Sequence, residues 1–373
     1  MQVIGIVTEY NPFHNGHLYQ IKKIKEMYPD SVIIVAMSGN YTMRGEISVL
    51  DKWNKTNIAI NNGIDIVLEI PFIYSNQSSD IFSYAALKML NEFKIEKLVF
   101  GSETNNIDLL SLASSVQIDN KKFDSLVKDY MSKGYNYPSS IGKSIYELTG
   151  IKIKESNDIL GVSYIKEILK NKYNIKPISI KRTTDYHDKE IDKRVASATS
   201  IRRNLNNVEK IKMVMPKISI DFIQKIDQEK YFELIKYQII SSYDLNCYLD
   251  VDEGIENKLK KTINEVNNLN DLILRVKSKR YSYSKIQRML LHIVCKFKKS
   301  DNDLKLKYIR VLGLNDNGAK IIREVKKNIN IPIITKYKKE YDDLFKIDKK
   351  ANFIYSLLTD YDMASEFKSC IKK

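Results

Sequence analysis

The sequence is short of cysteine and of long apolar runs, and both shortages restrict the classes of protein it can encode. Its three cysteines, Cys247, Cys295 and Cys370, are widely spaced and form no Cys-x-x-Cys pair, so neither a disulfide framework nor a cysteine zinc site is supported. No run approaches the roughly 18 apolar residues that a membrane helix needs. The first residues lack the segments of a signal peptide. We expect a cytoplasmic protein with no membrane partner.

Two common nucleotide-binding motifs are also missing, and histidine is scarce. The chain contains no G-x-x-x-x-G-K-[ST] P-loop and no G-x-G-x-x-G fingerprint for NAD. It has four histidines, of which His14 and His17 lie three residues apart in NPFHNGH. We therefore expect the chemistry to be concentrated in this first loop.

Short apolar runs alternate with stretches of helical periodicity in the first half of the chain. The runs occupy residues 3–8, 31–39, 65–71, 97–103 and 174–182. They are continuous rather than alternating in polarity, which is typical of strands buried on both faces. The pattern predicts a doubly wound α/β fold, with a parallel sheet and helices on both of its faces.

The second part of the chain is basic and mostly helical in pattern. Residues 1–150 carry 14 basic and 16 acidic side chains, whereas residues 151–373 carry 47 and 30. We predict two domains, residues 1–205 and a mostly α-helical basic domain at residues 206–373, where a short strand at 331–336 is the one candidate for β structure. Such a division suits small-molecule chemistry joined to the binding of a polyanion such as RNA. A generally lysine-rich proteome is the alternative explanation of the charge.

The loop NPFHNGH follows the first predicted strand and precedes the first predicted helix. Ligands of open parallel sheets bind at this edge, where helix N-termini attract phosphate. Gly16 allows close backbone approach, and the imidazoles of His14 and His17 can donate hydrogen bonds to phosphate oxygens. A zinc site is disfavoured because the loop lacks the helical His spacing and the third ligand.

A second element, SATSIRR at residues 197–203, has the composition of another phosphate grip. Small hydroxyl residues precede Arg202 at the start of a predicted helix. Taken alone, the element is better explained as a Ser/Thr-capped helix with surface arginines. The combination with the histidine loop favours the phosphate-binding interpretation.

The two elements together resemble the paired signatures of the nucleotidylyltransferase superfamily, whose members cleave ATP between the α and β phosphates. Longer strings along nearly the whole chain resemble the family of bacterial tRNA(Met) cytidine acetate ligases. These strings are GIVTEYNPFHNGH, MSGNYTMRGE, KWNKTNIAINNGIDIVLEIP, FGSE, NDILGVSYIKEI, KRTTDYHD, ASATSIR and RYSYSKIQRMLLHI. The resemblance implies a Rossmann-like fold and an enzyme that activates acetate with ATP as acetyl-adenylate. It further implies acetylation of N4 of the wobble cytidine in elongator tRNA(Met), with AMP and pyrophosphate as the other products.

The resemblance also assigns residues to the site. It implies catalytic roles for His14, His17 and Arg202. We also expect Mg²⁺ to bridge the phosphates, and we assign no metal-ligating residue and no obligate protein partner. Gly101 has an independent reason, because a side chain at the end of a predicted strand would obstruct an adenosine. Lys181 stands beside Arg182 and leaves that assignment open by one residue. The implied ATP-binding residues are Val7, Thr8, Glu9, Tyr10, Asn11, Pro12, Phe13, His14, Asn15, Gly16, His17, Leu18, Tyr19, Gln20, Gly101, Asn157 and Arg182.

Several alternatives stay open at this point. The protein could be a nucleotidylyltransferase that acts on a small phosphorylated cofactor precursor, or a non-enzymatic RNA-binding protein on a decayed nucleotide fold. Glu69, Asp80 and Glu103 could bind Mg²⁺, orient the amine or be ordinary solvated loop acids, and we do not place them in the site. The segment 277–288 is the candidate RNA-contact surface, because its cations lie on either side of Tyr281 and Tyr283. These cations are Lys277, Lys279, Arg280, Lys285 and Arg288. It could equally be an amphipathic helix packed on the core.

Overall fold

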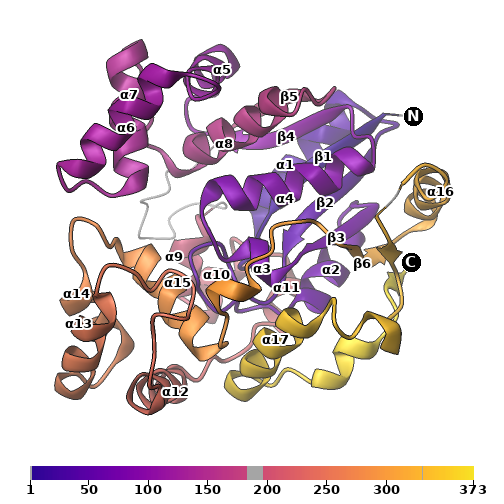
Figure 1. Ribbon diagram of the computed structural model, residues 1–373. Helices are drawn as coiled ribbons and strands as arrows, with labels where there is room; N and C mark the ends of the chain where they lie inside the picture. The colour runs from indigo at the N-terminus through magenta and orange to yellow at the C-terminus, as the bar shows by residue number, and fades with distance from the viewer. Residues whose placement is uncertain (1, 183–195, 330) are drawn as a thin grey trace.

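One mostly parallel sheet crosses the molecule (Figure 1). The computed structural model describes residues 2–182, 196–329 and 331–373, so most of the string KRTTDYHD and His187 lie outside the described residues. The strand order is β5-β4-β1-β2-β3-β6-β7, and β8 pairs with β6. The strands are β1 Val3–Thr8, β2 Val32–Ser38, β3 Ile66–Ile70, β4 Lys97–Ser102, β5 Lys176–Lys181, β6 Ile309–Leu314, β7 Ile333–Ile334 and β8 Ile371–Lys372.

Helices connect the strands of the first half and make up most of the second. Up to β5 these are α1 Asn15–Met27, α2 Lys52–Asn61, α3 Phe72–Ser75, α4 Ser79–Glu92, α5 Ile107–Ser115, α6 Lys121–Ser132, α7 Tyr137–Thr149 and α8 Ser156–Lys170. After it come α9 Ala198–Arg203, α10 Val208–Lys212, α11 Lys217–Asp221, α12 Gln228–Ser241, α13 Ile255–Thr262, α14 Leu269–Val276, α15 Tyr283–Val294, α16 Asp316–Val325, α17 Lys346–Leu358 and the short 3₁₀ turn η4 Met363–Phe367.

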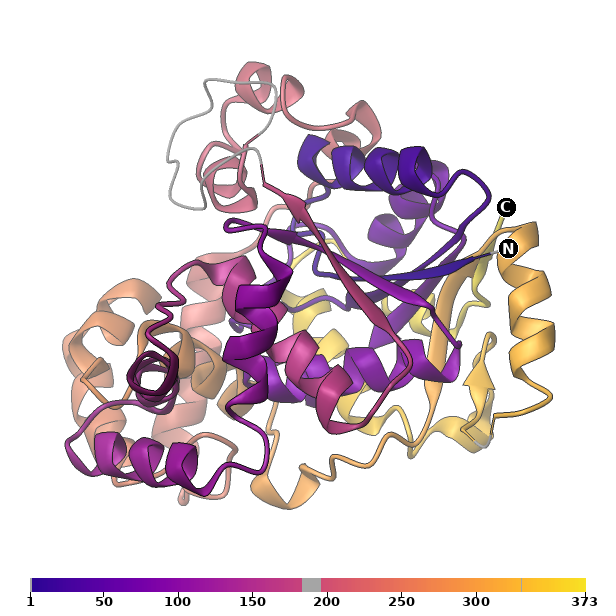
Figure 2. The same ribbon diagram turned by 90° about the horizontal axis from the view of Figure 1, so that it is seen from above.

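Both faces of the sheet are covered, as the continuous apolar runs predict. Along β2, Ile34 and Ala36 pack into a core shared with α4 and α8, whereas Ile33 and Val35 pack into a core shared with α1 and α2. Successive side chains of a strand point to opposite faces, so only a doubly covered strand buries all of them. Viewed from above, α1 lies on one side of the sheet and the α4 and α8 helices on the other (Figure 2).

Strand β1 lies in the middle of the parallel part of the sheet. It pairs in parallel with β2 on one side and with β4 on the other, and β2–β3 and β4–β5 are also parallel. The chain therefore runs outward through β2 and β3, returns to β4 beside β1, and continues to β5. The connections after β1 and β4 leave in opposite directions, which opens a crevice at the carboxyl ends of these strands.

The C-terminal part adds the strands β6, β7 and β8, of which the sequence did not predict β6 and β8. Strand β6 is antiparallel to β3, and β7 and β8 each pair in parallel with β6. Of these only β7 falls within the predicted candidate at 331–336. Because the sheet takes strands from both sides of residue 205, it does not itself mark a domain boundary there, and the two-domain division stays a prediction.

The C-terminal helices α12 to α15 and α17 enclose their own apolar core. The loop after β2 enters this core through Tyr41 and Ile47. The Tyr41 hydroxyl donates to the backbone carbonyl of Ala351 at 2.7 Å. The side-chain amide of Asn40 donates to the side-chain oxygen of Asn352 at 3.0 Å. The loop thus fixes the helical part against the sheet. No helix in the described part of the chain is long and apolar enough to span a membrane.

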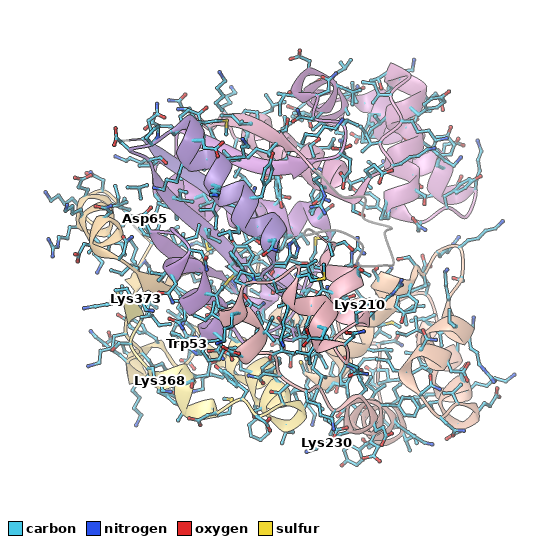
Figure 3. All side chains as sticks on the ribbon, turned by 180° about the vertical axis from the view of Figure 1, so that it is seen from behind. Trp53, Asp65, Lys210, Lys230, Lys368 and Lys373 are labelled. Carbon is cyan, nitrogen blue, oxygen red and sulfur yellow. The ribbon has the colours of Figure 1, made fainter. Side chains whose placement is uncertain are left out.

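A buried cluster of four charges ties α2 and β3 to the C-terminal segment. Lys52 Nζ lies 2.8 Å from Glu69 Oε1 and 2.9 Å from Glu366 Oε2. Arg310 Nη1 lies 3.3 Å from Glu69 and 2.9 Å from Glu366. Beside the cluster, Trp53 lies where α2 meets the C-terminal segment (Figure 3). The charges of the two cations and the two carboxylates cancel. Removing any one of the four would leave a buried charge without its partner, which is strongly destabilising.

Replacing Glu366 with Gln is expected to lower the free energy of unfolding by about 3 to 5 kcal/mol, because it leaves buried cations uncompensated. Burial alone would raise the pKa of Glu366, but Lys52 and Arg310 lower it to about 2. Its contribution is therefore present above pH 4.5, the ordinary value, and is lost as the pH falls toward 2. Urea unfolding at several pH values measures both effects.

The control for this experiment is Glu340→Gln. Glu340 is exposed and pairs with Lys338 at 3.3 Å, and removing such a surface pair costs at most about 0.5 kcal/mol. Equal losses in the two variants at pH 7 would contradict a special role for the buried cluster.

Candidate active site

A cavity of about 310 Å³ opens at the carboxyl ends of β1, β4 and β5, in the crevice that the strand order creates. It is lined by Val7, Thr8, Glu9, Tyr10, Asn11, His14, Gly16, His17, Tyr19, Gln20, Met43, Arg44, Glu46, Ser79, Phe82, Phe100, Gly101, Ser156, Asn157, Ile159, Leu160, Tyr164, Ile180, Lys181, Arg182, Ser197, Ala198, Thr199 and Arg202.

His14 and His17 begin helix α1 and cap it reciprocally. His14 Nδ1 accepts a hydrogen bond from the Gly16 amide at 3.0 Å, and His17 Nδ1 accepts one from the His14 amide at 3.2 Å. The rings stack with centroids 3.8 Å apart. Because the backbone amides occupy both Nδ1 atoms, the proton of each neutral ring lies on Nε2. The two rings therefore present Nε2–H donors.

Both imidazoles are held neutral. Burial, then the charges of Arg182 and Arg202, lower the pKa of His14 from 6.5 to about 3. Burial also lowers the pKa of His17 well below its usual range, helped by His14 and Arg182. At pH 7 the pair thus acts through hydrogen bonds rather than through positive charge.

Arg202 on α9 adds positive charge to this part of the cavity. Its Nη1 donates to the Asn11 carbonyl at 2.7 Å, and its Nη2 lies 2.8 Å from Glu46 Oε2. Ser197 caps α9 by accepting the Ser200 amide at 3.1 Å. The late SATSIRR element is thereby brought next to the first loop, nearly 190 residues away in the chain, as the phosphate-grip interpretation requires.

A second group of residues forms the wall between β4 and α8. Asn157 donates to Glu103 Oε1 at 2.6 Å, and Arg182 Nε lies 3.5 Å from the same oxygen. The Asp158 amide donates to Glu103 Oε2 at 3.2 Å. A Cβ on Gly101 would lie 3.3 Å from Arg182 Cγ, so a larger residue would press on this arginine. Glu103 thus fixes the positions of Asn157 and Arg182.

The structure brings most of the sequence-predicted residues to one cavity. His14, His17, Arg202, Gly101, Asn157 and Arg182 all line it, as does Lys181. Within the segment Val7–Gln20, four residues are not among the lining residues: Pro12, Phe13, Asn15 and Leu18. Phe13 instead packs fully buried beneath the loop, where its ring meets that of Tyr10 at 4.8 Å.

The three acids whose roles the sequence left open lie in different places. Glu69 belongs to the buried charge cluster, and Asp80 pairs with Lys166 at 2.5 Å. Glu103 alone contacts predicted site residues. Sequence reasoning missed this role, and it also missed Arg44 and Glu46, whose only signal was the family-like string MSGNYTMRGE. Their side chains reach the cavity through a loop whose path no local pattern specifies.

The fold, the crevice and the capped histidine pair are those of a nucleotidyl transferase. The sequence profile of the family described as HIGH Nucleotidyl Transferase matches residues 1–369, so the chain belongs to this family. Within it, the chain is 35% identical to the tRNA(Met) cytidine acetate ligase of Clostridium novyi, over 99% of this chain and 98% of that protein. It is also 35% identical to the enzyme of that name from Caldicellulosiruptor saccharolyticus, over 96% and 94%. The chain is a member of the tRNA(Met) cytidine acetate ligase family.

Solved structures agree with this assignment. The crystal structure of Thermotoga maritima TmcAL in its apo form superimposes with a TM-score of 0.91 at 26% identity, covering all of both chains. The structure of the same protein bound with alpha-thio ATP superimposes with a TM-score of 0.87, again over both whole chains. The predicted α/β architecture with a helical C-terminal part is confirmed.

The neutral Nε2–H state of the histidine pair can be observed directly. We expect ¹⁵N NMR of the imidazoles to show Nε2-protonated rings for His14 and His17 that do not titrate between pH 8 and pH 5, because their pKa values lie well below 6.5. His14→Gln and His17→Gln assign the signals. Titration of either ring near pH 6.5 would contradict this description of the site.

Proposed function

We propose that this protein is an ATP-dependent ligase that activates acetate as acetyl-adenylate and transfers the acetyl group to N4 of the wobble cytidine in elongator tRNA(Met). The observation that carries the proposal is the convergence of His14, His17 and Arg202 with Gly101 and Asn157 on one cavity at the switch point of the sheet. The family membership supplies the substrates. A cytoplasmic location, where tRNA and ATP meet, belongs to the same proposal.

In the first step an acetate oxygen attacks the α-phosphorus of ATP, and pyrophosphate leaves. The Nε2–H groups of His14 and His17 donate to phosphate oxygens as charge moves to the leaving group, and Arg202 supplies positive charge on the same side. Gly101, Asn157 and Arg182 hold the nucleoside. No protein nucleophile takes part, so the rate enhancement comes from alignment and electrostatic stabilisation.

Mg²⁺ belongs to the proposal as a companion of ATP. Bound together with ATP, it would neutralise charge that develops on the leaving pyrophosphate. No group of three or more His, Cys, Asp or Glu side chains in the described ranges could hold a metal ion. We therefore place the ion on the phosphates and assign no step to a protein-bound metal.

The candidate RNA-contact surface lies beside the cavity. Gly45 belongs to the loop that brings Arg44 and Glu46 to the cavity. It packs closely against α15: a Cβ at this position would lie 2.8 Å from the Arg288 backbone. On the other side of the 277–280 segment, the Asn136 side chain donates to the Lys279 carbonyl at 3.0 Å. The surface proposed to bind RNA therefore contacts, at Arg288, the loop that lines the cavity.

The residues of this surface divide into two groups. Residues 277–280 are exposed, whereas Tyr281 is 4% exposed and donates its hydroxyl to the Asp252 carbonyl, so it is not available for base stacking. Met289 and its neighbours on α15 enter the core, as the amphipathic alternative expected. Arg280 pairs with Glu253 at 3.2 Å. Lysines in the exposed segment therefore remain the best phosphate contacts.

The proposed activity is tested by transfer of labelled acetate into purified elongator tRNA(Met), followed by nucleoside mass spectrometry. We expect N4-acetylcytidine only when ATP and acetate are both present, and a fall in rate of roughly 10² or more for His17→Ala, comparable to the loss of one oxyanion-hole donor. ATP turnover with a small phosphorylated acceptor and no acetylated tRNA would favour the cofactor-precursor alternative. Unchanged activity of His17→Ala would remove its role.

Charge reversal tests the RNA-contact surface. Lys279→Glu is expected to weaken tRNA binding and to reduce the slope of log affinity against log salt by about one, because one phosphate contact is lost. Filter binding or fluorescence anisotropy at several salt concentrations measures both. Lys368→Glu is the control, since Lys368 lies on the C-terminal segment, seen from behind in Figure 3. Equal effects of the two variants would place the RNA elsewhere.

A further inference from the structure

Glu9 directly follows β1 and lines the cavity. Its Oε1 accepts a hydrogen bond from the Met43 amide at 2.6 Å, which fixes the carboxylate in place. Among the described residues, no group forms a hydrogen bond with Glu9 Oε2. This oxygen also keeps some exposure to solvent. One carboxylate oxygen is thus held and the other is available to a bound molecule.

The second step of the proposed reaction needs a proton acceptor. The lone pair of the cytosine N4 amine is delocalised into the ring, so this amine is a weak nucleophile. When it attacks the acetyl carbonyl, the new C–N bond makes its protons acidic, and one of them must leave. A positioned base contributes typically 10² to 10⁴ in rate to such a transfer.

Among the described histidines and carboxylates that line the cavity, the others are already committed. His14 and His17 accept backbone amide protons at Nδ1 and carry protons on Nε2, so neither has a free basic nitrogen. Glu46 lies 2.8 Å from Arg202. Glu9 is the remaining base that faces the cavity.

The surroundings of Glu9 suit this task. Burial and, more weakly, the charge of Glu46 raise its pKa above 4.5, while the Met43 amide, Lys55 and Arg44 oppose the rise. The buried Tyr164 on α8 also faces it. A carboxylate with a raised pKa is a stronger base.

We propose that Glu9 is the base that accepts the N4 proton of the target cytidine during acetyl transfer. The amine nitrogen forms a bond to the acetyl carbon, the bond between this carbon and the phosphate oxygen of AMP breaks with its electron pair on AMP, and the N4 proton moves to Glu9 Oε2. The proton then passes to solvent. The proposal rests on the proposed function, because it assigns a residue to its second step.

The test separates the two steps in wild type, Glu9→Gln and Glu9→Asp. Gln retains an oxygen for the Met43 amide but has no basic site. Acetate-dependent exchange between ATP and pyrophosphate reports the first step, and single-turnover acetylation of tRNA reports the second. We expect Glu9→Gln to slow transfer at least 10²-fold and at least tenfold more than exchange, and Glu9→Asp to recover part of the loss.

A pH profile distinguishes proton transfer from a structural effect. The wild-type transfer rate is expected to rise with pH as Glu9 ionises and then to level off, and Glu9→Gln is expected to lose this rise. Asp80→Asn, which removes an acid paired with Lys166, serves as control and should keep the wild-type profile.

Three results would overturn the proposal: unchanged transfer in Glu9→Gln, equal losses in exchange and transfer, or an unaltered pH profile. Failure of the proposed function would look different. In that case wild type itself would give no acetylated tRNA, whatever residue stands at position 9.

Discussion

The parallel pairing of β1 with both β2 and β4 is the constraint on which the site depends. It forces the connections after these strands to diverge, and the chain must leave a crevice at their carboxyl ends. Several residues of the proposed site are then brought to this edge: the histidine pair by the loop after β1, Gly101 by β4, and Arg182 by the end of β5. Capped imidazoles and arginines supply the hydrogen-bond donors of the crevice.

The loop after β2 connects the C-terminal helices to the cavity. It enters the apolar core of the C-terminal helices through Tyr41, and it brings Arg44 and Glu46 to the cavity. The helical part and the nucleotide crevice are therefore linked by one segment rather than by a flexible tether. In the proposed reaction this link positions a bound RNA relative to an activated acetyl group. The buried charge cluster fixes the C-terminal segment against α2 and β3.

The parts of this structure that could be predicted from sequence are those with local causes. Strands β1 to β5 follow from continuous apolar runs, and the histidine loop follows from its place between a strand and a helix. Strand β6 could not be found this way, because its six residues lie in helical surroundings and its partner β3 is more than 230 residues away. The contact of Glu103 with Asn157, and the tautomers of His14 and His17, likewise depend on distances between groups that no periodicity encodes.

The central claim is that the crevice joins acetate directly to the α-phosphate of ATP. Acetate labelled with ¹⁸O in both oxygens tests this claim most directly. If acetate attacks the α-phosphorus and the acetyl group is later transferred, one labelled oxygen stays on the nucleotide, so mass spectrometry of the product should find AMP that carries one ¹⁸O for each N4-acetylcytidine formed. Label in inorganic phosphate with ADP as the nucleotide product would instead show attack on the terminal phosphate, and it would contradict the account.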